Sequence, residues 1–202
     1  MAEKVIGVLA SGRGSNLQAI VDNIMQGYLP VKIGVVICDK SDAYALQRAA
    51  QVDIPACVIE RSSFSCKEDF EQAISEKLLE HNVQLVVLAG FMRLLGSKFI
   101  KNWHMKIMNI HPSLLPSFPG LHPQRQALTY GARVSGCTVH FVDEGMDSGP
   151  IILQKAVSVL DNDDEDALAA RILKEEHLLY SQAISLWAQS KIFISGRQVQ
   201  LK

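Results

Sequence analysis

The segment VIGVLASGRGSN, residues 5–16, decides the fold because an apolar strand passes through a glycine-rich turn directly into a helix. Residues 5–10 are apolar and typical of a buried strand. Over residues 15–26 the apolar side chains recur on one helical face: Leu17, Ile20, Val21 and Ile24. The glycines between strand and helix allow a sharp turn.

Apolar strands and helices alternate in the same way along the next hundred residues. The predicted strands are 5–10, 31–38, 55–59, 85–89 and 106–110, and the predicted helices are 15–26, 42–51 and 67–80. Strands that are apolar throughout indicate a parallel sheet covered on both faces. We therefore predict an α/β protein with three layers, a mixed but mostly parallel sheet, and a Rossmann-like N-terminal half.

The pattern changes after residue 123. A helix at 124–130 precedes two β runs, 134–142 and 151–160, and the short loop between them predicts antiparallel pairing. A long helix at 165–188 and a small hairpin at 191–201 are predicted to follow. Since no linker or repeat is visible, we predict a single domain over residues 1–202.

Composition excludes several classes of function. The 202 residues are 48% hydrophobic and 20% charged, as in globular proteins, and a net charge of −1 argues against nucleic acid as a partner. No apolar stretch approaches the roughly 20 residues of a membrane span, and no signal-type segment opens the chain. We expect a cytoplasmic protein that does not bind a membrane.

Metal chemistry and thiol chemistry are both disfavoured by spacing. The four cysteines, Cys38, Cys57, Cys66 and Cys137, are far apart and form no C-x-x-C pair. His177 lies on the long C-terminal helix without a second ligand at helical spacing. We expect no metal site and no disulfide framework.

The glycine-rich turn is a candidate phosphate site because a helix N-terminus offers free N–H groups to an anion. Ser15 or Asn16 can cap the helix or bind a phosphate oxygen. Asp39, at the end of the second strand, would suit the ribose of a dinucleotide, but Leu17 replaces the third glycine of that motif. A single phosphate is the preferred interpretation; a tight turn with a capped helix is the plain alternative.

Two polar residues, Asn109 and His111, lie at the end of the predicted strand at 106–110. Asn109 and His111 are two residues apart and share one side of an extended chain, and Pro112 cannot continue the ladder. An amide beside an imidazole can hold a developing oxyanion while a proton moves, which is the chemistry of acyl transfer. Asp147, in a Gly/Ser-rich loop, could meet His111 across the sheet; a turn-forming aspartate is the alternative.

Two further regions bear on a ligand site. Residues 91–95 follow a strand at its carboxyl end, where ligands of open α/β sheets bind, although a core-packed helix cap is an equal alternative. His140 lies inside a predicted strand and is expected to be a core imidazole or a support for the site.

Five motifs together resemble the phosphoribosylglycinamide formyltransferase family, folate-dependent enzymes of purine synthesis: residues 12–18, 89–93, 109–116, 120–122 and 147–150. The resemblance implies the formyltransferase fold, with a phosphate-binding half at about 1–100 and a folate and catalytic half at about 101–202. It also implies transfer of formyl, through a tetrahedral intermediate, from the co-substrate 10-formyltetrahydrofolate to the amine of 5'-phosphoribosylglycinamide, without a metal.

The resemblance also implies roles for individual residues. Asn109, His111 and Asp147 would be catalytic. The ribonucleotide would be held by Gly14, Ser15 and Asn16 at its phosphate and by Glu176 at its ribose. The folate site would comprise Lys67, Met92, Arg93, Leu94, Leu95, Asn109, Val142 and Asp143. Lys67 stands where the family usually has arginine, so this contact would lack the bidentate fork. The chain would act as a monomer or a homodimer.

Four other functions are weighed against this one. A formyltetrahydrofolate hydrolase would use the same Asn-His-Asp set with water as acceptor. A folate- or nucleotide-binding module would bind without turnover, and a nicotinamide dehydrogenase would need the missing glycine. A formyltransferase acting on transfer RNA is disfavoured because it would need a second domain and a basic surface.

Overall fold

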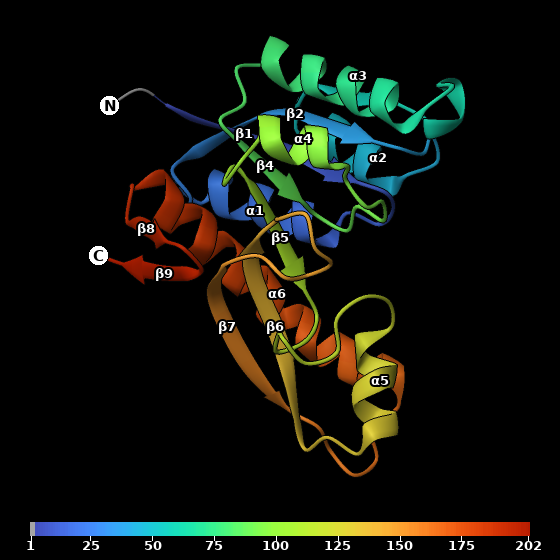
Figure 1. Cartoon of the computed structure of the whole chain (residues 1–202), viewed down its shortest axis with the longest axis vertical. Coiled ribbons are helices and arrows are strands. Elements are labelled where there is room, and N and C mark those ends of the chain that lie inside the picture. Colours follow the sequence, from blue (N-terminus) through green and yellow to red (C-terminus); the bar gives the residue numbers. More distant parts are fainter. Residues whose placement is uncertain (1–2) are drawn as a thin grey trace. The chain divides into compact units, whose positions relative to one another are not determined.

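The computed structural model, which describes residues 3–202, has seven strands hydrogen-bonded in the order β3-β2-β1-β4-β5-β6-β7 (Figure 1). The chain divides into two compact units within β5, Ile107–His111. The first unit ends at Met108 and the second is Asn109–Lys202. Each is described by itself below.

The first unit is a parallel α/β assembly. Its strands are β1 Lys4–Ala10, β2 Val31–Cys38, β3 Ala56–Val58 and β4 Leu85–Leu88. Its helices are α1 Ser15–Met25, α2 Tyr44–Ala50, the 3-10 turn η1 Arg61–Ser63, α3 Lys67–Glu80 and α4 Ser97–Asn102. β1 pairs in parallel with both β2 and β4, and β2 pairs in parallel with β3.

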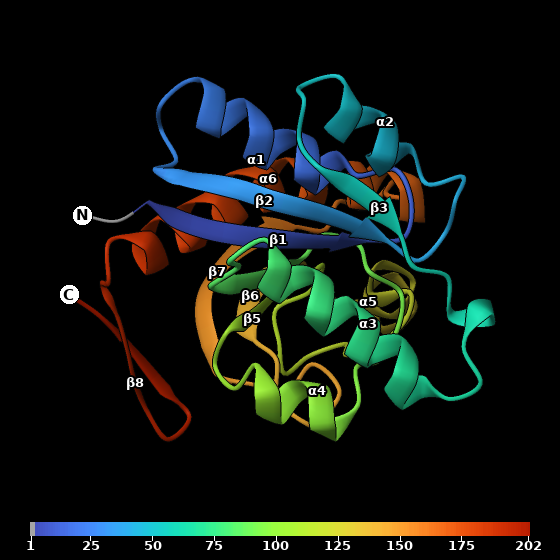
Figure 2. The same cartoon turned by 90° about the horizontal axis from the view of Figure 1, so that it is seen from above.

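Helices cover both faces of these strands. Figure 2 shows α1 and α2 on one face of β1 and β2, and α3 on the other. The packing of α3 is so close that a Cβ atom added at Gly7 of β1 would lie 2.4 Å from Leu78 Cδ2. Side chains on both faces of β1 and β2 are therefore buried, which explains why these strands read as continuous apolar runs.

The second unit is built on an antiparallel pair. β6 Val134–Phe141 pairs with β7 Ile151–Ser158, and α6 Glu165–Ala188 packs against both strands. α5 Pro123–Tyr130 packs on α6. A hairpin of β8 Ile192–Ser195 and β9 Gln198–Leu201 ends the chain, and β9 lies beside β7.

Local sequence explains where the helices of this unit begin and end. The Asp164 carboxylate accepts a hydrogen bond of 2.7 Å from Ala167 N at the start of α6. α5 begins with Pro123 in its first turn and ends at Gly131, whose φ of 76° suits a residue without a side chain.

The predicted α/β fold with a mixed, mostly parallel sheet is confirmed, as are the antiparallel pair and the C-terminal hairpin. Some bounds were wrong by one or two residues; the fifth strand, for example, is Ile107–His111 rather than 106–110. The prediction missed α4, Ser97–Asn102, because six residues are too few to display a helical period. The single domain stays a prediction.

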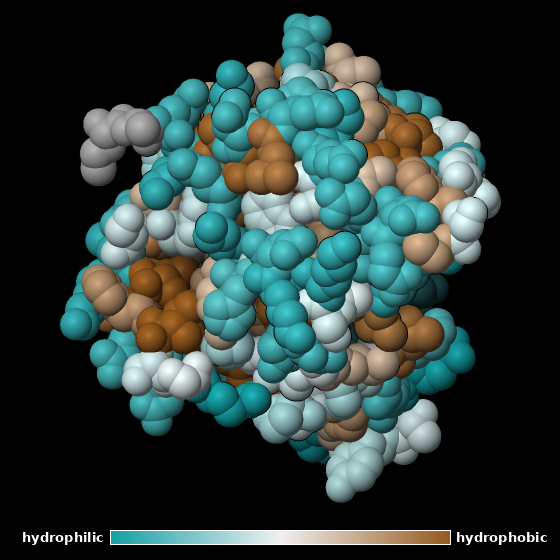
Figure 3. Space-filling view, turned by 45° about the horizontal axis from the view of Figure 1, so that its top comes forward, coloured by the Kyte–Doolittle hydropathy of each residue, from teal (hydrophilic) through white to brown (hydrophobic). Residues whose placement is uncertain are grey.

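The surface is mostly polar. Figure 3 shows hydrophilic side chains over most of one face, with apolar side chains in small separate patches. Within residues 3–202, no helix combines the length and the apolar character that a membrane crossing requires.

Candidate active site

The end of β5 presents the predicted polar pair. Ile107 and Met108 are fully buried, Asn109 is half-buried and His111 is buried. Pro112 follows His111 and ends the strand because it has no N–H to donate to the ladder. Asn109 and His111 both contact a group of polar residues contributed by β6 and by the loop that follows it.

His111 lies between two acceptors. Its Nε2 is 2.9 Å from the carbonyl oxygen of Phe118, and its Nδ1 is 3.4 Å from Oδ2 of Asp147. Because a carbonyl can only accept, Nε2 carries a proton in this arrangement. The Asp147 carboxylate can then accept a hydrogen bond from Nδ1 only when the ring carries a second proton.

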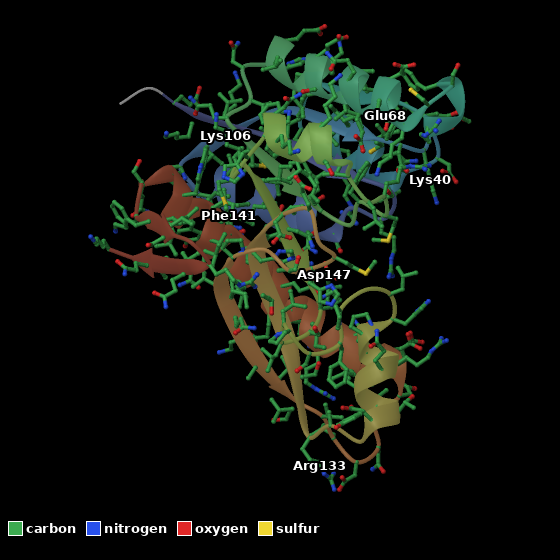
Figure 4. The ribbon with its side chains drawn as sticks, viewed as in Figure 1. Lys40, Glu68, Lys106, Arg133, Phe141 and Asp147 are labelled. Atoms are coloured by element: carbon green, nitrogen blue, oxygen red, sulfur yellow. The ribbon has the colours of Figure 1, made fainter. Side chains whose placement is uncertain are left out.

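Asp147 is held in place by the backbone. Gly120 N donates a hydrogen bond of 2.8 Å to Oδ2, the same oxygen that faces His111. Asp147 itself has a φ of 49°, in the left-handed region that aspartate tolerates better than most residues. Figure 4 marks Asp147 on the loop between β6 and β7.

His140, the last residue but one of β6, completes the cluster. It is 2% exposed, and its Nδ1 is 2.8 Å from the Phe141 carbonyl oxygen. Burial lowers the pKa of His140 and outweighs the opposing effects of the Phe141 hydrogen bond and of the Asp147 carboxylate. The neutral ring thus carries its proton on Nδ1, which leaves Nε2 free to accept.

The acceptor nitrogen of His140 orients Asn109. Nε2 lies 3.2 Å from Asn109 Nδ2, so the amide nitrogen donates one of its two N–H groups to His140. Nε2 also lies 3.8 Å from Asp147 Oδ1. The second N–H of Asn109 remains to bind an oxygen atom that gains negative charge.

Together these groups suit acyl transfer. Asn109 offers a fixed donor for an oxyanion, and the His111–Asp147 pair offers a site that can take or deliver a proton. The cluster needs no activated protein nucleophile, because a neutral amine can attack a carbonyl directly. The predicted meeting of His111 with Asp147 is present in the structure.

A hydrogen-bond network supports the loop that carries the Phe118 carbonyl. Thr138 Oγ1 donates to Ser113 O over 2.7 Å and accepts from Leu115 N over 3.0 Å. Gln154 Nε2 of β7 then donates to Leu115 O over 2.8 Å. The peptide bond before Pro116 is cis.

Sequence reasoning missed Phe118, Gly120 and Thr138 as parts of the site. Phe118 and Gly120 act through backbone atoms, which leave no trace in residue type. Thr138 could not be placed by strand alternation with His140, because the register of β6 shifts between Val139 and His140.

In the first unit, Gly14 shapes the glycine-rich turn. It is the N-cap of α1 with a φ of 66°, and an added Cβ would lie 2.8 Å from Ala45 Cβ. Two separate constraints, backbone conformation and close packing, therefore require glycine here. The carbonyl of Gly12 accepts from Ala45 N over 3.1 Å, which ties the turn to α2.

The other predicted phosphate ligands follow directly in the chain. Ser15 is half-buried and Asn16 is buried in the first turn of α1, where backbone N–H groups lack intrahelical partners. The N-cap residue is Gly14, so no capping side chain binds these backbone N–H groups. Gly14, Ser15 and Asn16 thus lie together at an N-terminus able to bind an anion.

Residues 91–95 are held beside the glycine turn. Ser11 N donates to Gly90 O over 3.1 Å, and Met92 N donates to Ser11 Oγ over 2.9 Å. Met92 and Leu94 are 69% and 66% exposed, so this segment is not the core-packed helix cap of the alternative interpretation. Leu95 is half-buried.

Arg93 forms an ion pair with Asp39, whose side chain is buried. The same guanidinium lies 5.7 Å from the centre of the Phe70 ring. This pairing employs the carboxylate that a dinucleotide ribose would require, which weakens the dinucleotide interpretation further.

The remaining predicted residues are distributed over both units. Lys67 pairs with Glu71 over 3.7 Å on α3. Val142 follows β6 and is half-buried, and Asp143 Oδ1 accepts from Ser148 Oγ over 2.6 Å. Glu176 is buried on α6. The predicted ribonucleotide and folate sets each draw on both units, so their assembly stays a prediction.

Metal and thiol chemistry find no support in residues 3–202. That part of the chain contains no group of three or more His, Cys, Asp or Glu side chains arranged to hold a metal ion. Burial raises the pKa of Cys38 and of Cys137 to about 12, so both thiols are protonated at neutral pH.

Comparisons with known proteins agree with this chemistry. Residues 4–184 match the family described as Formyl transferase. A Bacillus subtilis phosphoribosylglycinamide formyltransferase is 45% identical over 90% of this chain and 93% of its own length. A solved glycinamide ribonucleotide transformylase 1 from Symbiobacterium toebii superposes with a TM-score of 0.97 at 48% identity, covering 98% of this chain and 94% of that one.

Longer relatives contain a similar segment. The trifunctional purine biosynthetic protein adenosine-3 of Drosophila melanogaster is 46% identical over 195 residues. The match covers 95% of this chain but only 14% of that protein. The chain thus spans a small part of the trifunctional relatives and nearly all of the bacterial relative above.

Proposed function

The chain belongs to the formyl transferase family, and from this premise we propose that it formylates 5'-phosphoribosylglycinamide with 10-formyltetrahydrofolate. The reaction would be a step of de novo purine (IMP) biosynthesis. Support comes from the names of the Bacillus and Symbiobacterium relatives, which share 45% and 48% of their aligned residues with this chain.

The observation that carries the proposal is the cluster of Asn109, His111 and Asp147. Addition of an amine to a formyl group requires a hydrogen-bond donor for the oxygen and a group that moves a proton. The amide N–H of Asn109 and the His111–Asp147 pair supply these. 10-Formyltetrahydrofolate would supply the formyl carbon. A carbonyl oxygen fits beside Asn109 because His140 holds the amide with its nitrogen toward the cluster.

Each residue then has a distinct task. Asn109 donates a hydrogen bond to the formyl oxygen, which gains negative charge as the amine adds. When protonated, His111 would polarise the same oxygen by its positive charge, because its Nε2 donates to the Phe118 carbonyl oxygen and its Nδ1 faces Asp147. Asp147, which lies 3.4 Å from His111 Nδ1, stabilises the charged imidazole and helps move the proton from the attacking amine to the folate nitrogen. The tetrahedral intermediate then collapses: the bond between the formyl carbon and that nitrogen breaks, the formyl group stays on the ribonucleotide amine, and tetrahydrofolate leaves.

Binding of the two substrates would supply much of the rate. Gly14, Ser15 and Asn16 would bind the ribonucleotide phosphate at the N-terminus of α1, and Glu176 would bind the ribose hydroxyls. A good fraction of the barrier can be removed by holding amine and formyl carbon in contact. The exposed apolar residues Met92 and Leu94 suit a flat heteroaromatic ring.

The rest of the folate site is part of the same proposal. Arg93, Leu95, Val142 and Asp143 would line it, and Lys67 would face the glutamate tail. We expect the protein to work in the cytoplasm as a monomer or a homodimer.

The deciding experiment is a spectrophotometric assay of deformylated folate, run with and without the ribonucleotide. Release that depends on the ribonucleotide supports the transferase. Release in its absence would identify a hydrolase instead. No release from a folded protein that binds both ligands would leave a binding module and would overturn the proposal.

Variants then test the cluster. Asn109→Ala, His111→Asn and Asp147→Asn should each lower kcat by about a hundredfold or more while the protein stays folded. Asp161→Asn and His104→Asn are matched controls at exposed positions. Rates that stay within twofold of the wild type in all three cluster variants would contradict the assignment.

A further inference from the structure

The loop that carries Asp147, residues 142–150, is held by hydrogen bonds near its start and at its end. Near its start, Asp143 Oδ1 accepts from Gly145 N over 3.1 Å and from Ser148 Oγ over 2.6 Å. At its end, Phe141 N donates to Pro150 O over 2.9 Å. Residues 144–146 between these ties are exposed.

The loop end is also packed tightly. A Cβ atom added at Gly149 would lie 1.8 Å from the Phe141 carbonyl oxygen, so the backbone here passes directly over β6. The chain that follows Ser148 is therefore confined by β6.

Arg197, which is 49 positions after Ser148 in the chain, contacts the backbone of Ser148. Arg197, at the tip of the β8–β9 hairpin, donates from Nη2 to the carbonyl oxygen of Ser148 over 2.7 Å. Ser148 directly follows Asp147. A guanidinium hydrogen bond to a carbonyl is charge-assisted and stronger than a neutral one.

The hairpin is built to present this arginine. Ile192 pairs with Leu201 and Ser195 pairs with Gln198, which leaves Gly196 and Arg197 at the turn. Gly196 has a φ of 57°, as a tight hairpin turn requires. β9 lies beside β7, so the hairpin has a support within the second unit.

We propose that Arg197 is a positioning residue for Asp147. Its hydrogen bond fixes the peptide after Ser148 and thereby keeps the Asp147 carboxylate facing His111 and Gly120 N. The role in catalysis rests on the proposed function, whereas the tether itself is a property of the free protein.

Loss of the tether should loosen the loop and lower turnover together. Arg197→Ala should raise amide exchange of residues 143–149, and kcat should fall about fivefold, as expected for one exposed hydrogen bond. The KM for the ribonucleotide should not change, because the tether acts on Asp147 and not on the residues proposed to bind the ribonucleotide. Arg197→Lys, which keeps a donor, should restore most of the rate.

The test combines hydrogen exchange and kinetics on the full chain, with Gln198→Ala as the control in the neighbouring, exposed hairpin position. The proposal predicts faster exchange confined to 143–149 in Arg197→Ala alone, and no further loss of rate when Arg197→Ala is added to Asp147→Asn. The proposal would be overturned if amide exchange of the loop did not change, or if exchange became faster in the hairpin itself. It would also be overturned if Arg197→Ala lowered kcat as much in the Asp147→Asn background as in the wild type.

The exchange measurement separates the two proposals. If the wild type catalyses no formyl transfer, the proposed function fails, yet exchange at residues 143–149 still decides whether Arg197 holds the loop. If transfer occurs and exchange does not respond to Arg197→Ala, only the tether fails.

Discussion

The side-chain nitrogen of Asn109 lies 3.2 Å from Nε2 of His140, a contact that fixes which end of the amide can meet a substrate oxygen. The carbonyl oxygen of Phe141 determines which ring nitrogen of His140 carries the proton, because it accepts a hydrogen bond from Nδ1–H over 2.8 Å. With Nε2 left as an acceptor, Asn109 must present nitrogen rather than oxygen. The proposed oxyanion site would thus depend on a histidine that need not touch the substrate.

His140→Leu should therefore lower kcat by about tenfold, because the amide of Asn109 loses the acceptor that orients it. His140→Gln, which keeps an acceptor oxygen, should lose less. The measurement is steady-state kcat for both variants, with circular dichroism to confirm folding. Equal rates for the leucine variant and the wild type would show that Asn109 is oriented by something else.

The same histidine should make stability depend on pH. Burial lowers the pKa of His140 in the folded state below its ordinary 6.5, and nearby His111 acts in the same direction against the Asp147 and Asp143 carboxylates. Below pH 6.5 the unfolded chain binds a proton here that the folded chain does not. The free energy of unfolding should thus fall as pH decreases, until the folded-state pKa is reached.

Urea titrations between pH 7.5 and pH 5 should reveal this effect as a difference between the wild type and His140→Gln. The wild type should lose up to about 1.4 kcal/mol more per pH unit, the linkage limit for one proton. A difference that is flat with pH, or of the opposite sign, would mean that His140 is not kept neutral by burial.

Gly14→Ala should destabilise the protein by about 1–3 kcal/mol, since the new Cβ meets Ala45 and the left-handed backbone becomes strained. Gly12→Ala is the matched control, because no atom lies within 4 Å of its added Cβ. Thermal unfolding of both variants is the measurement. Calorimetric titration with the ribonucleotide should show weaker binding for the Gly14 variant alone, and equal melting temperatures would contradict the packing argument.

Sequence alone predicted the parts of the site that follow from periodicity. Asn109 and His111 were identified because residues two apart on a strand share a side, and Gly14 because a strand ran straight into a helix. The prediction that Asp147 meets His111 had weaker support from the residues alone, because a turn-forming aspartate was the favoured explanation of Asp147 without the histidine. It gained weight from the family resemblance.

What sequence could not supply is long-range and made by backbone atoms. The Phe118 carbonyl binds His111 and the Gly120 N–H binds Asp147, although neither residue type suggests it. The ion pair between Arg93 and Asp39 joins residues 54 apart and could not be read from spacing. Such contacts depend on how segments pack after the fold has formed.

That ion pair leads to a prediction about the segment at residues 91–95. The Asp39 side chain is 2% exposed and that of Arg93 is 38% exposed, so Arg93→Met would leave a buried carboxylate without its cation. We expect a loss of about 2 kcal/mol in the free energy of unfolding, measured with urea, since removing one partner of a buried pair strands the other charge. The double variant Asp39→Asn/Arg93→Met should recover part of this loss by removing the stranded charge.

Lys77→Met is the control, because Lys77 pairs with Glu80 on the exposed side of α3 and its removal should leave the urea midpoint unchanged. Equal midpoints for Arg93→Met and Lys77→Met would show that Asp39 finds another partner, and the segment would then be held by the Ser11–Met92 hydrogen bond alone.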